Sequence, residues 1–220
     1  ITGSIGVSVY PEDGDDLDAL TRSADRAMYH AKNAGRNSYR CYTPELEEAE
    51  RDRLYMESQL REALSRQELV LHYQPQFDLK TGRLVGLEAL ARWRHAQLGD
   101  VPPANFIAVA EDSGLIGQVG AWALRSACRQ ASVFRPSTRF PVRVAVNVSS
   151  LQFASPNFVE LVEQTLAETG IDGNLLELEL TESLLMKGDE CGPRMAKLRD
   201  LGVHLSIDDF GTGYSSLGYL

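Results

Sequence analysis

Four short stretches of the chain share one arrangement of apolar and oxygen-bearing side chains, and this arrangement limits the folds open to it. The stretches are residues 87–92, 142–148, 175–181 and 203–208. Successive side chains of a strand point to opposite faces, so each stretch separates an apolar face from a polar one. One oxygen-bearing residue recurs near the end of each strand on its polar face, and the four are Glu88, Asn147, Glu179 and Asp208.

Two kinds of sheet are compatible with such strands. Antiparallel strands with their polar face toward water explain any single stretch. Segments with helical spacing lie between the strands, however, and this order is typical of β/α units with a parallel sheet whose apolar face is covered by helices. We therefore predict an α/β fold with a largely parallel sheet, whose polar face points inward if the sheet closes into a barrel. The four polar side chains should then converge at the carboxyl ends of the strands, where barrel enzymes keep their active sites.

The predicted elements follow this alternation. We expect strands at 69–74, 84–92, 142–148, 175–181 and 203–208, and helices at 104–111, 117–134, 157–169 and about 192–201. Ahead of them, residues 2–10 predict a strand and residues 17–35 a helix that ends near Gly35. The Glu-, Arg- and Leu-rich segment 44–64 predicts a linking helix. We accordingly expect three parts, at 1–43, 44–58 and 59–220.

Converging carboxylates need a positive charge between them, because like charges a few ångström apart raise one another's pKa. The net charge of −9 argues against a DNA or RNA polymer as partner, so a divalent cation is the natural source. Carboxylates with one amide oxygen suit Mg²⁺ or Mn²⁺ better than zinc. Asp208 and the adjacent Asp209 could serve two metals. His204 is excluded as their partner, since four strand residues place it about 13 Å from Asp208.

Five segments spread over about 150 residues resemble the motifs of the EAL domain family. They are Tyr73-Gln74-Pro75-Gln76, Gly86-Leu87-Glu88-Ala89-Leu90-Ala91-Arg92-Trp93, Val146-Asn147-Val148-Ser149, Glu179-Leu180-Thr181-Glu182-Ser183 and the aspartate-pair loop at 208–217. The resemblance implies a (β/α)₈ barrel that hydrolyses cyclic di-GMP to linear pGpG with Mg²⁺ or Mn²⁺.

The resemblance also implies a role for each matching residue. Glu88, Asn147, Glu179 and Asp208 would bind the first metal, and Asp208 with Asp209 the second. Glu182 would steady the aspartate-pair loop, so that the catalytic set is Glu88, Asp208, Asp209 and Glu182. Gln74, Leu90 and Arg92 would contact the substrate, Arg92 at a phosphate, which its planar fork of donors suits.

Two other functions stay open at this point. The domain could be a sensor that binds cyclic di-GMP without hydrolysing it, or a structural fragment that dimerises through the linking helix and the loop after Asp209. The metal ligands present in the sequence favour the enzyme. As partners we expect cyclic di-GMP and a second copy of the chain, bound through the EAL domain.

The opening segment has a resemblance of its own. Residues 2–7 and 24–37 resemble the end of a GGDEF domain, the diguanylate cyclase fold, but the signature Gly-Gly-Asp/Glu-Glu-Phe does not occur in the sequence. We therefore expect no cyclase activity here, and expect the GGDEF domain and a sensor domain to lie upstream in the same protein.

The length and the cysteines complete the expectations. A barrel of this kind takes about 250 residues, so we expect an incomplete barrel, with the family's catalytic Lys and a later metal-binding Glu beyond Leu220, and weak or no turnover by the chain alone. Cys41, Cys128 and Cys191 form no Cys-x-x-Cys pair. This favours a reducing, cytoplasmic location, and membrane attachment would have to come from upstream.

Overall fold

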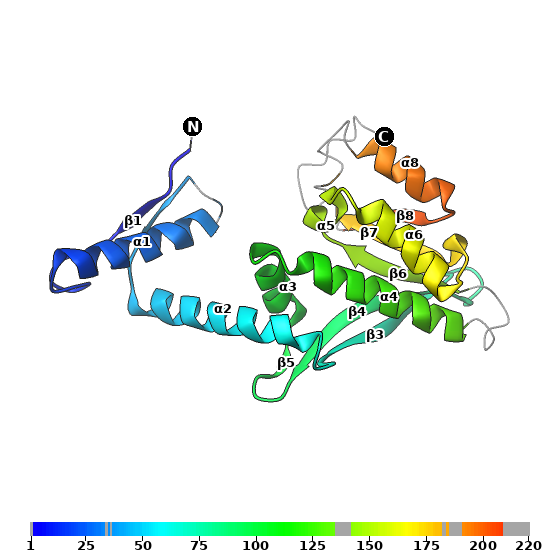
Figure 1. Cartoon of the computed structure of the whole chain (residues 1–220), viewed down its shortest axis with the longest axis horizontal. Coiled ribbons are helices and arrows are strands. Elements are labelled where there is room, and N and C mark those ends of the chain that lie inside the picture. The colour runs from blue at the N-terminus through cyan, green and yellow to red at the C-terminus, as the bar shows by residue number, and fades with distance from the viewer. Residues whose placement is uncertain are drawn as a thin grey trace. The chain divides into compact units, whose positions relative to one another are not determined.

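The computed structural model describes residues 2–33, 35, 37–134, 142–181, 184 and 191–208. The chain forms two compact units, residues 1–59 and 60–220. In the first, strand β1 (Ile5–Val7) pairs in parallel with β2 (Tyr39–Cys41), and helix α1 (Leu17–Asn33) packs against both (Figure 1). Gly6 makes this packing possible, because a Cβ there would lie 1.8 Å from the Ala24 carbonyl oxygen.

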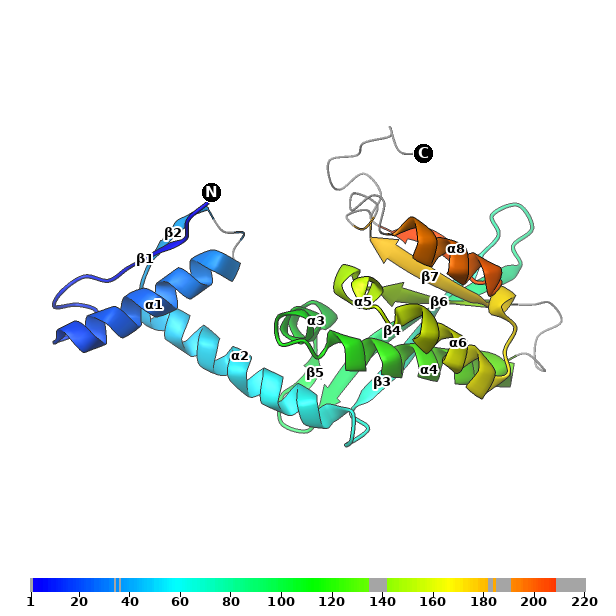
Figure 2. The same ribbon diagram turned by 45° about the horizontal axis from the view of Figure 1, so that its top comes forward.

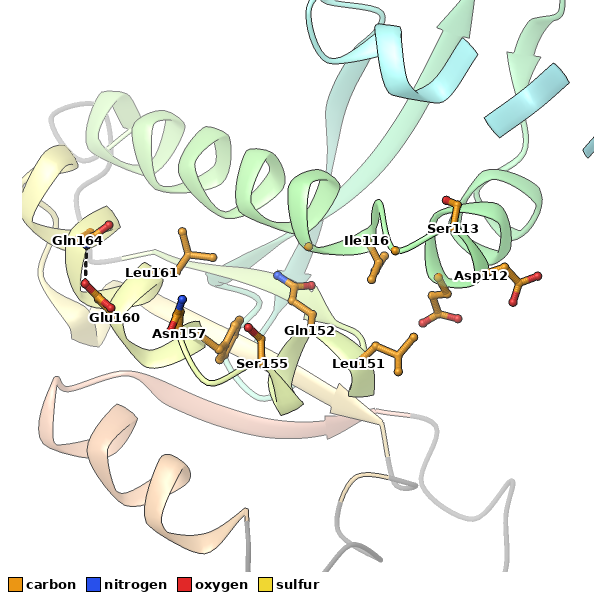
Figure 3. Close-up of a pocket in the computed structure, with 14 residues that line it drawn as sticks. Asp112, Ser113, Ile116, Leu151, Gln152, Ser155, Asn157, Glu160, Leu161 and Gln164 are labelled. Atoms are coloured by element: carbon orange, nitrogen blue, oxygen red, sulfur yellow. Dashed lines mark hydrogen bonds between the residues drawn. The ribbon is translucent and has the colours of Figure 1, made fainter. Parts of the chain in front are cut away.

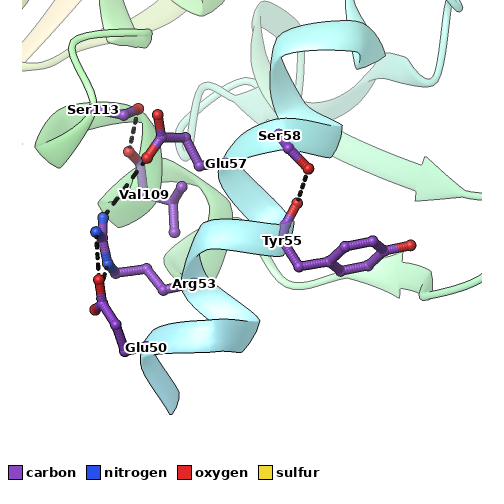
Figure 4. A network of polar contacts seen from close by, with 7 residues as sticks. All are labelled: Glu50, Arg53, Tyr55, Glu57, Ser58, Val109 and Ser113. Atoms are coloured by element: carbon purple, nitrogen blue, oxygen red, sulfur yellow. Dashed lines mark hydrogen bonds and ion pairs between the residues drawn. The ribbon is translucent and has the colours of Figure 1, made fainter. Parts of the chain in front are cut away.

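Helix α2 (Pro44–Ala63) follows, and it carries ion pairs between its own side chains. Arg53 pairs with Glu50 at 3.0 Å and with Glu57 at 3.9 Å, one turn away on either side (Figure 4). Such pairs contribute about 0.3–0.5 kcal/mol each. Only Leu60 and Ala63 of this helix are buried among the described residues.

The second unit is built on a mixed sheet whose strands follow the order β3-β4-β6-β7-β8, with β5 on β4. The strands are β3 (Leu69–Phe77), β4 (Leu84–His95), β5 (Gly99–Val101), β6 (Arg143–Val148), β7 (Leu176–Thr181) and β8 (His204–Asp208). The pairs β4–β6, β6–β7 and β7–β8 are parallel, whereas β3 and β5 run antiparallel to β4.

Helices cover the apolar face of this sheet, as Figures 1 and 2 show for α4, α6 and α8. The helices of this unit are α3 (Pro103–Asp112), α4 (Ile116–Phe134), α5 (Ser150–Ala154), α6 (Phe158–Thr169) and α8 (Gly192–Asp200), with a 3₁₀ turn η2 at Gly173–Leu175. Leu124, Phe158 and Leu198 bring the helices onto the buried valines of β6 and leucines of β7. Burying each such side chain contributes about 1.5–3 kcal/mol, so this layer is the main source of stability.

The structure confirms the predicted alternation, with each strand and helix that was predicted in the second unit lying within three residues of its expected bounds. It also confirms that the four patterned strands pair in parallel beneath helices. The short elements β2, β5 and α5 were not predicted. None of the helices in the described ranges is both long enough and apolar enough to span a membrane.

Candidate active site

The polar face of the sheet carries the predicted ligands. Side chains of β7 alternate strictly, so that Leu176, Leu178 and Leu180 are buried while Glu177 and Glu179 are only half-buried on the other face. In β6 the same alternation buries Val146 and Val148 and leaves Asn147 exposed. The apolar layer therefore determines the direction in which the polar side chains point.

From β4 to β8, the predicted ligands shift by register toward the carboxyl ends of the strands. Glu88 pairs with Ala145, which lies two residues before Asn147. Asn147 pairs directly with Glu179. Glu179 in turn pairs with Ser206, two residues before Asp208.

This shift in register from strand to strand has a simple geometric meaning in a barrel. Strands lie about 4.8 Å apart and rise about 3.3 Å per residue. A shift of about four residues over three strand steps therefore tilts the line through the ligands by roughly 40° from the perpendicular to the strands. Strands of closed barrels tilt by about the same angle from the barrel axis. In a closed barrel whose strands tilt in this sense, Glu88, Asn147, Glu179 and Asp208 would share one height, as convergence on one site requires.

Glu88 and Asn147 are in direct contact. The Asn147 amide Nδ2 donates to Glu88 Oε1 at 2.9 Å. This hydrogen bond joins neighbouring strands β4 and β6 and turns the amide nitrogen toward the carboxylate. The Asn147 amide oxygen is then the atom suited to a cation.

Glu179 lies at the electrostatic centre of the row. Burial, together with the negative charges of Glu88 and Asp208, raises the pKa of Glu179 from 4.5 to about 7. Its Oε2 is buried and has no hydrogen-bond partner within the described part of the chain, and the same holds for Oγ of Ser206 on the neighbouring strand. A buried carboxylate beside other negative charges is stabilised by a positive charge. The donor set therefore fits a divalent cation.

The row spreads over four strands, and two of the predicted site residues are not among the described ones. Within the ranges that the structure describes, no three His, Cys, Asp or Glu side chains are grouped closely enough to hold a metal ion. Asp209 and Glu182, both predicted as catalytic, lie outside these ranges. The described part of the site thus consists of Glu88, Asn147, Glu179 and Asp208.

The predicted substrate contacts lie on β4, the strand that carries Glu88, and on its neighbour β3. Gln74 of β3 is exposed and pairs with Glu88. Leu90 and Arg92 follow Glu88 along β4 on the same face and are half-buried, and the Arg92 guanidinium donates to the Ala91 carbonyl oxygen at 2.8 Å. The structure thus brings all three near the row of ligands, while their roles toward a substrate remain predictions.

Two features of the site were not assigned from the sequence. Arg143 forms an ion pair with Glu177 at 3.2 Å, which balances a further carboxylate on this face. Gln76 lies on the same face, with its side-chain amide over Gly86 of β4, although only its place in the Tyr73–Gln76 motif was noted. Its parity with Gln74 along the strand was a signal that could have indicated it.

The comparisons with known proteins agree with the geometry. Residues 57–220 match the EAL domain family. The chain belongs to this family. Residues 1–38 match the diguanylate cyclase, GGDEF domain. The EAL and GGDEF matches thus lie in the same order along the chain as the two resemblances seen in the sequence.

Relatives and solved structures of EAL proteins cover most of the chain. It is 43% identical over 221 residues to the bifunctional diguanylate cyclase/cyclic di-GMP phosphodiesterase MucR of Pseudomonas aeruginosa, and 42% identical over 221 residues to the cyclic di-GMP phosphodiesterase NbdA of the same organism. Each alignment covers 100% of this chain, but only 32% of MucR and 28% of NbdA. The chain therefore spans about a third or less of these relatives.

The solved structure of the PaMucR phosphodiesterase in complex with c-di-GMP superposes with a TM-score of 0.72 at 43% identity. The superposition covers 75% of this chain and 67% of that one. A second structure, the EAL enzyme Bd1971 with cAMP and cyclic-di-GMP bound, gives a TM-score of 0.72 at 31% identity, covering 78% of this chain and 48% of that one. The fold of the second unit is therefore the barrel-type EAL fold.

A pocket of about 850 Å³ lies away from this row, between the turn joining α3 to α4 and the helices α5 and α6 (Figure 3). It is lined by Asp112, Leu151, Gln152 and Glu160, among others, and by none of the predicted EAL site residues. Volume alone does not make an active site, and the polar face of the sheet has the chemistry that the pocket lacks.

Proposed function

We propose that this chain hydrolyses cyclic di-GMP to linear pGpG in a reaction that depends on Mg²⁺ or Mn²⁺. The observation that carries the proposal is the row of Glu88, Asn147, Glu179 and Asp208 on one face of an EAL fold. The named activities of MucR and NbdA, and the c-di-GMP complex of PaMucR, support the choice of substrate.

The residues of the row would hold the cation. Glu88, Asn147, Glu179 and Asp208 would bind one metal, and Asp208 with Asp209 a second. A divalent cation, when bound, supplies positive charge at the phosphoryl oxygens and lowers the pKa of the attacking water. The mutual repulsion that raises the pKa of Glu179 disappears once a cation lies among the carboxylates.

The remaining residues of the face would orient the substrate. Gln74 and Arg92 flank Glu88 and offer donors to phosphate and guanine oxygens, and Leu90 offers an apolar contact. Hydrolysis forms one bond between phosphorus and the water oxygen and breaks one bond between phosphorus and a ribose oxygen, leaving a linear dinucleotide. Glu182 would hold the loop that carries Asp209.

The test is product analysis with purified protein. The full-length protein is incubated with cyclic di-GMP and Mg²⁺ or Mn²⁺, and the nucleotides are separated by chromatography. We expect pGpG from the wild type and a loss of at least about 100-fold in Glu88→Ala and Asp208→Ala, because each removes a charged ligand. Glu163→Ala, at an exposed position of α6, is the matched control and should keep full activity.

Other outcomes would point to other functions. Undiminished hydrolysis in Glu88→Ala or Asp208→Ala would contradict the site. Binding of cyclic di-GMP without product would favour the sensor, and binding of neither metal nor nucleotide the structural fragment. A homodimer through the EAL domain and a cytoplasmic location stay predictions, and sedimentation of the full chain with cyclic di-GMP would test the first.

A further inference from the structure

A buried amide without a hydrogen-bond partner lies in the pocket between the α3–α4 turn and helices α5 and α6. Gln152 of α5 lines this pocket and is only 5% exposed, and its side chain makes no hydrogen bond within the part of the chain that the structure describes. In Figure 3 its amide points into the pocket, between Ile116 of α4 and Leu161 of α6. Because a buried polar group without a partner is costly, the amide favours an occupant that can form hydrogen bonds with it.

Gly120 of α4 determines the directions in which the amide can bond. A Cβ added to Gly120 would lie 2.2 Å from both Oε1 and Nε2 of Gln152 and 2.3 Å from its Cδ. A point at nearly equal distance from all three atoms lies above the amide plane, so the amide rests with its flat face on α4. Hydrogen bonds of an amide lie close to its plane. The donor and the acceptor of Gln152 are therefore directed along the pocket and not into the helix beneath it.

The charge of the pocket favours a cation. Three carboxylates line it, those of Glu111, Asp112 and Glu160, and none of its described lining residues is Lys, Arg or His. Glu160 accepts a hydrogen bond from Nε2 of Gln164 at 3.1 Å, which holds its carboxylate on the pocket wall (Figure 3). The first turns of α4 and α6 also line the pocket, but a helix N-terminus contributes only about half of a positive charge. The full negative charges of the carboxylates outweigh them.

Apolar side chains complete the pocket. Ile116, Leu151 and Leu161 line it beside Gln152, and Leu151 is half exposed although it is large and apolar. An apolar group that covered Leu151 would be stabilised by the area removed from water. The volume of about 850 Å³ lies within the range of about 300–1,000 Å³ that is typical of small-molecule sites. The pocket thus offers an apolar wall, an amide and negative charge to one ligand.

We propose that this pocket binds an organic cation, in which an amine or guanidinium group is carried on an apolar body. The apolar body lies against Leu151 and Leu161, the cationic group is attracted by the carboxylates, and the amide of Gln152 hydrogen-bonds the ligand. None of the predicted EAL site residues lines the pocket, so the proposal does not depend on the hydrolysis of cyclic di-GMP.

The test uses a matched pair of probes, tryptamine and indole-3-propionate, which share an indole ring and a two-carbon stem but carry opposite charges. Their binding to the full-length protein is titrated by saturation-transfer NMR. We expect saturable binding of tryptamine and at least about tenfold weaker binding of indole-3-propionate. The preference for tryptamine should fall several-fold in the double variant Asp112→Asn/Glu160→Gln. Glu163→Gln, at an exposed position of α6 outside the pocket, is the matched control and should leave it unchanged.

Two further variants separate binding from folding. Gln152→Leu keeps the approximate size of the side chain and removes its hydrogen bonding, so tryptamine should bind about tenfold more weakly. The midpoint of thermal unfolding should not fall, because the amide has no partner among the described residues. Gly117→Met places a side chain in the pocket, where an added Cβ meets nothing within 4 Å. It should abolish tryptamine binding, again without a fall in the unfolding midpoint.

Three results would overturn the proposal: no saturable binding of tryptamine up to about 10 mM, equal binding of the two probes, or unchanged tryptamine binding in both Gln152→Leu and Gly117→Met. A lower unfolding midpoint in Gln152→Leu with no change in tryptamine binding would likewise show that the amide serves the packing of α5 alone.

Discussion

At the scale of single residues, Glu179 shows how the fold and the chemistry of the site oppose each other. The alternation of β7 places this carboxylate on the polar face, half-buried beside Glu88 and Asp208. Without a cation the folded chain holds a proton there more tightly than an unfolded chain does. The ionised form of Glu179 therefore lowers the stability of the metal-free fold, at the position where the protein would bind metal.

This cost predicts a pH dependence of the metal-free protein. Because the pKa of Glu179 is raised from 4.5 to about 7, its contribution to the free energy of unfolding is fully present below pH 4.5. The contribution is lost as the pH rises toward 7. Urea unfolding in metal-free buffer should show a decline in stability between pH 5 and pH 7.5 that is smaller in Glu179→Gln.

Mn²⁺ should remove the same decline in the wild type, since a bound cation favours the ionised carboxylate. An equal loss of stability with pH in the wild type and in Glu179→Gln would show that the proton is bound elsewhere.

Residue contacts were also the least predictable part of the site. The residue types and their parity were enough to indicate Glu88, Asn147, Glu179 and Asp208, because period-two alternation is a local property. The ion pair of Arg143 with Glu177 was not predictable, since it depends on how far two side chains extend between the neighbouring strands β6 and β7. Parity gives a direction for a side chain, but not its reach.

At the scale of elements, long periodic segments were predicted well and short ones were missed. Helix α4 buries Val119, Ala123 and Leu124 at helical spacing, which is visible in the sequence. The antiparallel pairing of β3 with β4 had a signal that was not used. Only six residues, 78–83, join the two strands, too few for the crossover helix that parallel strands require. Helix α5 spans five residues and offers no periodicity.

Helix α5 follows directly after the strand that carries Asn147, and its first turn depends on one side chain. Ser149 is its N-cap, and its Oγ accepts a hydrogen bond from the Gln152 backbone N–H at 3.2 Å. We expect Ser149→Ala to lower the free energy of unfolding by about 1 kcal/mol, measured by urea denaturation. Ser132→Ala, at an exposed position of α4, should change it by less than about 0.5 kcal/mol. Equal effects of the two variants would contradict the capping role.

At the scale of the whole molecule, the chain contains two units that differ in origin and in content. The first carries the match to the GGDEF domain, and the second the match to the EAL domain with its row of ligands. The sequence predicts three parts, at 1–43, 44–58 and 59–220, because the pattern changes after the linking helix, and these bounds stay a prediction. The contact boundary at residue 59 lies close to the start of the EAL match at residue 57.

A change confined to the first unit should therefore leave the second intact. In Gly6→Ala the new Cβ would lie 1.8 Å from the Ala24 carbonyl oxygen and 2.4 Å from the Met28 nitrogen, and helix backbone cannot yield. We expect β1 to separate from α1 at a cost of about 1–3 kcal/mol. Hydrogen exchange followed by mass spectrometry should show faster exchange in residues 17–33 and no change in residues 176–181.

The control for this experiment is Gly3→Ala, where an added Cβ meets nothing within 4 Å. Faster exchange in both units of Gly6→Ala would mean that the two fold as one cooperative body.

The shift in register of the four ligands across β4, β6, β7 and β8 restricts how such a chain can change during evolution. Each ligand is placed by the number of residues that precede it on its strand. A single inserted or deleted residue ahead of Asn147 or Glu179 would rotate that side chain into the layer beneath the helices and break the row. Substitutions can accumulate on these strands, but insertions and deletions should be tolerated only in the loops between them.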